Sequence, residues 1–208
     1  MRIPVGEAFA LEGEAELLAG APAAVVCHPH PAFGGRMDVP LVILLAETLR
    51  AAGWSTLRFN FRGLDGSGGT PTGGLLEHED VAAAVAWLRA QGAPRVALVG
   101  YSFGALMAAR ALARGLDAVG LAAVGFPTTI VGHDPERVTE IERALDRGLP
   151  WLFVNGDRDQ FCEVDRVEAW VEGRSWARIE LLAGRGHFFN VPDEEDVCRR
   201  VRDFVTAL

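Results

Sequence analysis

Short apolar runs alternate with amphipathic segments from residue 22 to the end of the chain. The runs are rich in valine, alanine and leucine and too short for buried helices, which favours buried strands. Turn-forming residues separate them from the segments that follow. The pattern predicts strands within 23–31, 54–61, 95–100, 118–127, 150–157 and 176–184.

The segments between these runs carry apolar residues at helical spacing. Within 75–91, for example, Val81, Val85 and Leu88 fall on one face of a helix. The helix expected over 39–53 has Asp38 as its candidate N-terminal cap. Further helices are predicted over 103–115, 135–148, 163–173 and 193–208.

Apolar strands that alternate with helices are buried on both faces and pair in parallel. Residues 3–20 form the exception, because they predict a hairpin with its turn near Glu12-Gly13. The expected fold class is therefore α/β, with a doubly wound, mostly parallel sheet and an antiparallel N-terminal hairpin. We expect a single domain over residues 1–208, without a lid, because the connection 126–150 has room for one helix.

Composition excludes several function classes. The chain of 208 residues has a net charge of −8 with no long basic run, so nucleic acid is not an expected partner. All 20 basic residues are arginine. No segment is long and apolar enough to span a membrane, and the N-terminus does not resemble a signal peptide, so we expect a cytoplasmic protein. Three cysteines without a paired spacing favour neither a disulfide framework nor a zinc ribbon.

A serine stands between a predicted strand and a predicted helix, in Gly100-Tyr101-Ser102-Phe103-Gly104. A Gly-x-Ser-x-Gly segment in that context is typical of a nucleophile elbow, a tight turn that lifts the hydroxyl clear of the sheet. The amide after the serine lies at a helix N-terminus, where an oxyanion is stabilised. The alternative is a chance match, expected about 0.05 times in a chain of this composition.

A serine nucleophile needs a histidine as base and a carboxylate that orients it. His187, in a glycine-rich loop after the last strand, is the preferred base, and His133 is the alternative. Two carboxylates follow the strand at 150–157. We favour Asp159, whose position further out gives it more reach toward His187, and interpret Asp157 as a turn former.

The loop "HPHPAFGG" follows the first buried strand and is expected to provide the second oxyanion amide. Prolines have no N–H, which leaves the backbone of His30, together with that of Phe103, as the predicted oxyanion hole. Ala32 and Phe33 lie behind His30. The same His-x-His spacing also permits a metal site, which we consider less favoured because few further ligands follow the strands. Cys27 is expected to lie in the core rather than to act as a nucleophile.

Three more residues are candidates for the pocket. Phe33 and Phe126 are aromatic residues near predicted strand ends. Arg62 opens the glycine-rich loop "RGLDGSGGTPTGG", where it either holds the loop through hydrogen bonds or meets an acidic substrate. The loop lacks the Lys-Ser/Thr of a phosphate-binding P-loop.

Five segments together resemble one known family. They are "HPHPAFGGRMD", "TLRFNFRGLDGSGG", "GYSFGA", "NGDRDQF" and "GRGHFF", and the likeness covers nearly the whole chain. They are similar to the small lidless bacterial α/β-hydrolases, a group related to dienelactone hydrolases and serine-peptidase-like esterases. The resemblance implies Ser102, Asp159 and His187 as catalytic residues and an oxyanion hole at the "HPHP" loop. Dienelactone hydrolases proper use a cysteine nucleophile, so their substrate is not implied.

The sequence therefore predicts a serine hydrolase of carboxylic esters or thioesters that needs no metal or cofactor. Its expected partner is a small-molecule substrate, and the oligomeric state stays open. A serine peptidase or amidase of the same fold is the second hypothesis. A non-catalytic binding protein that keeps the fold is the third.

Overall fold

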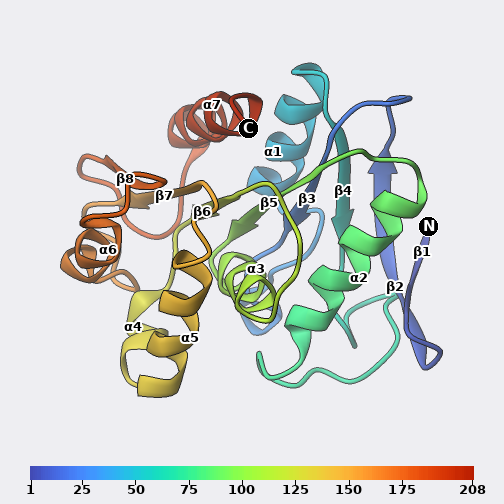
Figure 1. The fold of residues 1–208 in the computed structure, drawn as a ribbon, viewed down its shortest axis with the longest axis horizontal. Coiled ribbons are helices and arrows are strands. Elements are labelled where there is room, and N and C mark those ends of the chain that lie inside the picture. The colour runs from blue at the N-terminus through green and yellow to red at the C-terminus, as the bar shows by residue number, and fades with distance from the viewer.

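The central feature of the structure, a computed structural model that describes residues 1–208, is an eight-stranded sheet with the order β1-β2-β4-β3-β5-β6-β7-β8 (Figure 1). Strands β3 to β8 are parallel, while β2 pairs in antiparallel fashion with both β1 and β4. The doubly wound, mostly parallel sheet with an antiparallel N-terminal hairpin is confirmed. The strands are β1 Arg2–Val5, β2 Phe9–Glu16, β3 Ala23–Cys27, β4 Ser55–Phe59, β5 Val96–Tyr101, β6 Leu121–Val124, β7 Trp151–Gly156 and β8 Ala177–Leu182.

Helices cover both faces of this sheet (Figure 1). The first and last α-helices pack together on one face, and the other helices lie on the opposite face. The α-helices are α1 Pro40–Ala51, α2 Glu77–Ala90, α3 Phe103–Ala113, α4 Thr128–Gly132, α5 Pro135–Leu145, α6 Val164–Val171 and α7 Val191–Thr206, and a 3-10 turn spans Pro31–Phe33.

Successive residues of a central strand feed two separate cores. In β5, Leu98 packs in the core under α2 and α3, whereas Val99 packs in the core under α1 and α7. Both are fully buried. This two-residue alternation is the pleat of a strand that has apolar layers on both sides, which is why the sequence shows continuous apolar runs.

The hairpin turn lies at residues 6–8 rather than at Glu12-Gly13, so the predicted position of the turn is wrong. Gly13 lies inside β2. A Cβ at this position would lie 2.8 Å from the Ile3 side chain and 3.0 Å from the carbonyl oxygen of Arg58, which leaves room only for glycine. The close approach of two neighbouring strands, rather than a turn, explains this glycine.

Two further expectations need correction. Helix α1 is capped by the backbone of Val39 with Pro40 in its first turn, and Asp38 makes no capping bond. The connection between β6 and β7 holds two helices, α4 and α5, rather than one. None of the helices combines the length and the hydropathy that crossing a bilayer requires.

Candidate active site

Ser102 occupies a sharp turn between β5 and α3, at the carboxyl ends of the parallel strands. Its backbone has φ 53° and ψ −113°, a conformation that is strained for a residue with a Cβ. Glycines two positions away make the turn possible. A Cβ at Gly100 would lie 2.4 Å from the amide nitrogen of Ala105, and one at Gly104 would lie 2.3 Å from the carbonyl oxygen of Cys27.

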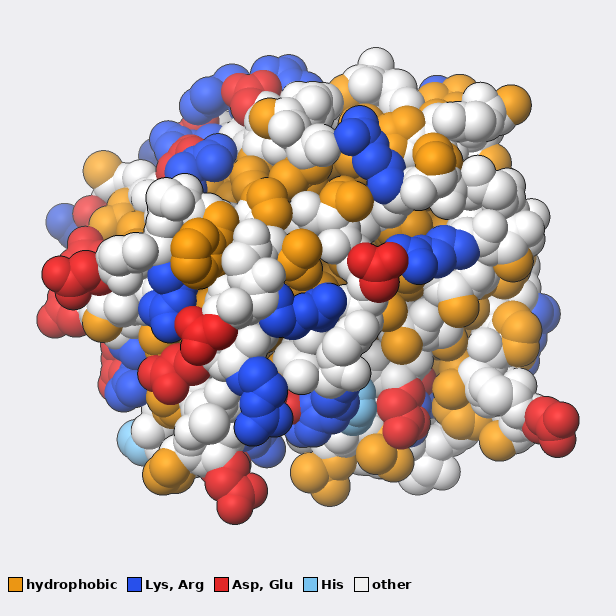
Figure 2. All heavy atoms as spheres, in the orientation of Figure 1, with side chains coloured by type: hydrophobic (Ala, Val, Ile, Leu, Met, Phe, Trp, Pro, Cys, Tyr) orange, Lys and Arg blue, Asp and Glu red, His pale blue; other side chains and the backbone are white.

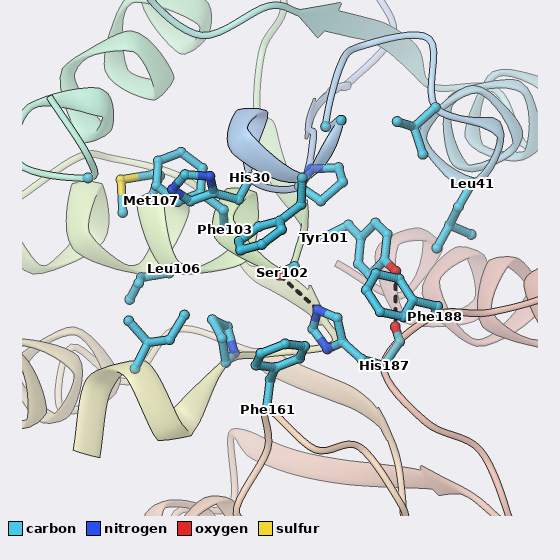
Figure 3. A pocket seen from close by; sticks show the side chains of 18 of the residues that line it. His30, Leu41, Tyr101, Ser102, Phe103, Leu106, Met107, Phe161, His187 and Phe188 are labelled. Atoms are coloured by element: carbon cyan, nitrogen blue, oxygen red, sulfur yellow. Dashed lines mark hydrogen bonds between the residues drawn. The ribbon is translucent and has the colours of Figure 1, made fainter. Parts of the chain in front are cut away.

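The side chains of Ser102, His187 and Asp159 form one chain of hydrogen bonds, of which Figure 3 shows the link between Ser102 and His187. His187 Nε2 lies 2.9 Å from Ser102 Oγ, and His187 Nδ1 lies 2.8 Å from Asp159 Oδ2. The three residues come from loops after β5, β7 and β8. A hydroxyl bound to a histidine that is oriented by a carboxylate is the arrangement of an activated nucleophile.

The Asp159 carboxylate is buried and held by its own loop. Its Oδ1 accepts a 2.8 Å hydrogen bond from the Phe161 amide, and its Oδ2 accepts a longer one, 3.4 Å, from Asn155 Nδ2. Asp157 instead accepts a 2.6 Å bond from the Gly184 amide, which ties the β7 loop to the loop that carries His187. The structure thus brings Asp159, and not Asp157, to the histidine.

Tyr101 anchors the loop that carries His187. Its hydroxyl donates a 3.0 Å hydrogen bond to the backbone carbonyl of His187. Burial raises the pKa of Tyr101, so the phenol stays protonated and remains a donor. The Phe161 ring packs edge-on against the imidazole, with 4.7 Å between ring centroids. The imidazole is therefore held by packing as well as by its two hydrogen bonds.

Some backbone amides of the "HPHP" loop donate hydrogen bonds within the protein, and others do not. The Ala32 amide donates to His30 Nδ1, and the Phe33 amide donates to the His30 carbonyl. The His30 amide makes no hydrogen bond within the protein, and neither does the Phe103 amide at the start of α3. His30 and Phe103 therefore have the unpaired donors that an oxyanion requires.

His28, the other histidine of this loop, is wholly buried and bonded to backbone at both ring nitrogens. Nδ1 contacts the Pro29 carbonyl at 2.7 Å, and Nε2 accepts a 3.1 Å bond from the Phe61 amide. Burial lowers its pKa to about 4, so the ring is neutral. His28 ties the end of β3 to the end of β4, and the structure contains no group of three or more metal-ligating side chains around it or elsewhere.

A cavity of about 460 Å³ opens beside Ser102, and Figure 3 shows side chains that line it. This volume suits a small ligand. Phe33 lines it with a side chain that is 80% exposed, at the rim. Other lining residues, which the sequence did not single out, include Leu41, Tyr101, Leu106, Met107, Ile130, Phe161 and Phe188.

Two predicted pocket residues lie outside this cavity. Phe126 has 0% exposure and packs between Phe153 and Trp170 in the core. Arg62 is buried too, and its guanidinium binds the Asp80 carboxylate, with a shortest distance of 2.7 Å. The loop-holding interpretation of Arg62 fits this geometry, whereas its placement in the pocket is wrong.

Several cavity residues that the sequence analysis did not name belong to helices. In a helix, the sequence shows only the helical spacing of apolar residues. Met107 and Leu106 lie in α3 after Ser102, and Leu41 lies in α1. One signal was available. Residues in the first turns of helices that follow the strands lie near the carboxyl ends of those strands, where ligands bind.

Together, the sheet, the serine elbow and the histidine define the class of α/β serine hydrolases. The protein family described as "Alpha/beta hydrolase domain" matches residues 22–201, and the chain belongs to it. An uncharacterized protein of Rickettsia prowazekii is 30% identical over 198 residues, which cover 90% of this chain and 80% of that protein.

Two solved structures support the same assignment. An alpha-beta serine hydrolase homologue from Coxiella burnetii superposes with a TM-score of 0.82 at 28% identity, covering 98% of this chain and 95% of that one. A lidless member of the α/β serine hydrolases from Xanthomonas campestris has a TM-score of 0.77 at 27% identity, covering 100% and 93%. The expected resemblance to small lidless α/β-hydrolases is confirmed.

Proposed function

We propose that the protein hydrolyses carboxylic esters or thioesters through an acyl-enzyme on Ser102. The observation that supports this most directly is the pair of short contacts of His187, 2.9 Å to the Ser102 hydroxyl and 2.8 Å to the Asp159 carboxylate. Geometry of this kind is what a general base needs in order to take the serine proton.

In the proposed first step, Ser102 Oγ attacks the acyl carbon while its proton passes to His187 Nε2. The carbonyl oxygen becomes an oxyanion that accepts hydrogen bonds from the amides of His30 and Phe103. The tetrahedral intermediate then collapses, the bond to the alcohol or thiol breaks, and His187 gives its proton to that leaving group. Asp159 stabilises the imidazolium throughout.

In the second step, water replaces the leaving group. His187 takes a proton from the water, whose oxygen attacks the acyl carbon, and the second tetrahedral intermediate releases the carboxylic acid. The proton returns to Ser102 Oγ. These steps use only side chains and backbone amides of the protein.

The shape of the cavity favours small or exposed acyl groups. It is lined largely by apolar side chains, and Phe33 at its rim is mostly exposed. A substrate with a short acyl chain, or with an ester exposed on a larger molecule, fits such an open site.

The test is a Ser102→Ala variant assayed with p-nitrophenyl butyrate. We expect kcat to fall by a factor on the order of 10³ to 10⁶, because the acyl-enzyme cannot form. A fluorophosphonate probe should label the unmodified protein and leave the variant unlabelled. Unchanged turnover by the variant would refute the proposal, and a native protein that neither labels nor turns over would indicate a non-catalytic binding protein.

A further inference from the structure

A second hollow, of about 620 Å³, lies between α3 and α5 at the end of the loop before α2. We call it the arginine groove, because four of its ten lining residues are arginines. Figure 2 shows basic side chains on this face of the molecule, with acidic side chains among them. The lining residues are Leu75, Arg110, Arg114, Asp134, Pro135, Glu136, Arg137, Thr139, Glu140 and Arg143.

The arginines of the groove outnumber the carboxylates that neutralise them. Glu140 is shared, since it binds Arg110 Nε at 2.9 Å and also contacts Arg114. Arg143 is exposed and has no carboxylate within ion-pair distance. Glu140 is thus the one carboxylate that forms ion pairs with these three guanidinium groups, while the charges of Glu77 and Asp134 act on Arg110, and that of Glu79 on Arg114, from a greater distance.

Two acidic residues also line the groove. Asp134 binds Arg137 Nε at 3.1 Å, so its charge is already matched. Glu136 is exposed at the start of α5 and forms no ion pair. Both lie in the first turn of α5 or just before it, away from Arg143 near its end, so Arg143 keeps an unpaired positive charge while Arg110 and Arg114 share Glu140.

Arg110 is the buried member of this set, with a side chain that is 8% exposed. Its Nη1 has no hydrogen-bond partner, and neither does Nδ1 of the neighbouring, buried His78. Burial, together with the charges of Arg114 and Arg110, lowers the pKa of His78 to about 4, so its imidazole is neutral. A buried guanidinium nitrogen without a hydrogen-bond partner is costly, and an oxyanion that binds beside it reduces that cost.

The arginine groove adjoins the cavity at Ser102, because Arg137 lines both. Helix α3 also joins the two, since it begins immediately after Ser102 and contains Arg110. At 1.5 Å per residue, Arg110 lies about 12 Å along the helix from Ser102. A substrate that reacts at Ser102 would therefore need an arm of about this length between its scissile bond and the group that the arginines bind.

We propose that the arginine groove is a subsite for a phosphate group carried by the leaving group of the substrate. A phosphate has nearly two negative charges and several acceptor oxygens. It therefore matches three guanidinium groups better than a carboxylate ligand, which has one charge and two oxygens. We place the phosphate on the leaving group rather than on the acyl group. The leaving group must depart before water attacks, and the groove is open and polar. The acyl group stays in the apolar cavity. This inference rests on the proposed function.

The experiment compares thioesters that differ only in the phosphate: S-butyryl pantetheine and S-butyryl 4′-phosphopantetheine. We expect kcat/KM to be at least tenfold higher for the phosphorylated thioester, mainly through a lower KM. The Arg143→Gln variant, which breaks no ion pair, should lose at least half of this gain, and Arg114→Gln/Arg143→Gln should lose most of it. Arg202→Gln, which makes the same charge change on α7, should keep the gain.

Three readouts keep the two proposals distinguishable. Turnover of neutral p-nitrophenyl butyrate should be the same in all variants, and its absence in the unmodified protein would refute the proposed function. Calorimetric titration with 4′-phosphopantetheine, which has no scissile bond, tests the groove even then. Equal kcat/KM values for the two thioesters, or full binding by the double variant, would overturn the subsite.

Discussion

At the scale of single residues, the candidate site depends on which of two similar side chains faces the histidine. Asp157 and Asp159 follow the same strand and belong to the same loop, yet only Asp159 reaches His187. The other carboxylate binds a backbone amide and joins two loops. The sequence favours Asp159 because this residue lies further out along the loop, and in the structure its carboxylate lies 2.8 Å from His187 Nδ1.

Substitution of each carboxylate by its amide should separate these roles. Asp159→Asn leaves the packing intact but removes the negative charge that orients and stabilises the imidazolium, so kcat should fall by about 10⁴. Asp157→Asn keeps an acceptor for the Gly184 amide, and kcat should change less than about threefold. Steady-state kinetics with p-nitrophenyl butyrate would measure both. The reverse order of effects would assign the acid to Asp157.

At the scale of elements, the serine elbow constrains how a strand meets a helix. Helix α3 approaches β3 so closely that a Cβ at Gly104 would lie 2.3 Å from the carbonyl oxygen of Cys27. The contact is with backbone, which cannot rotate away. Position and orientation of the Ser102 hydroxyl are therefore coupled to the spacing between these two elements.

A Gly104→Ala variant should lose both stability and activity. Overpacking against backbone typically costs about 1–3 kcal/mol, and the displaced elbow should reduce kcat at least tenfold. Gly148→Ala is the matched control, because Gly148 has φ +71° and a Cβ added there would meet nothing within 4 Å, so only backbone strain is added. Urea unfolding and ester hydrolysis measure the two effects. A Gly104→Ala protein with native kcat would show that the elbow tolerates the methyl group.

The elements themselves were largely predictable. Helices α2 and α5 begin within two residues of their expected starts, because regular apolar spacing marks their buried faces. The turn of the N-terminal hairpin was not predictable, since Gly13 serves a close strand contact that resembles a turn signal. Of the candidate site, the order of serine, acid and histidine could be predicted. The pocket walls could be predicted only in part, because Phe33 lines the cavity whereas Phe126 and Arg62 turn into the interior.

At the scale of the whole molecule, a histidine that is buried without charge links folding to pH. His28 is fully buried and its pKa is lowered to about 4, against an ordinary value of 6.5. Between these two values the unfolded chain binds a proton that the folded protein excludes. The free energy of unfolding therefore falls as the pH falls from about 6.5 toward 4.

The His28 contribution should reach about 3 kcal/mol near pH 4, at about 1.4 kcal/mol per pH unit. Urea unfolding at pH 7.5, 6.5, 5.5 and 4.5 would measure it. In His28→Gln, which keeps an acceptor for the Phe61 amide but does not titrate, the loss of stability between pH 6.5 and 5.5 should be smaller. Parallel pH profiles for the two proteins would show that another group governs the acid sensitivity.

The anchoring of the histidine loop by Tyr101 and Asp157 has a practical consequence. Neither bond involves the nucleophile, so the imidazole and the cavity should keep their places when the hydroxyl is deleted. A protein of that kind is a receptor that holds its ligand without consuming it. Soaked in a mixture of cellular metabolites and then recovered, the Ser102→Ala form should serve as bait for retrieving the natural substrate by mass spectrometry.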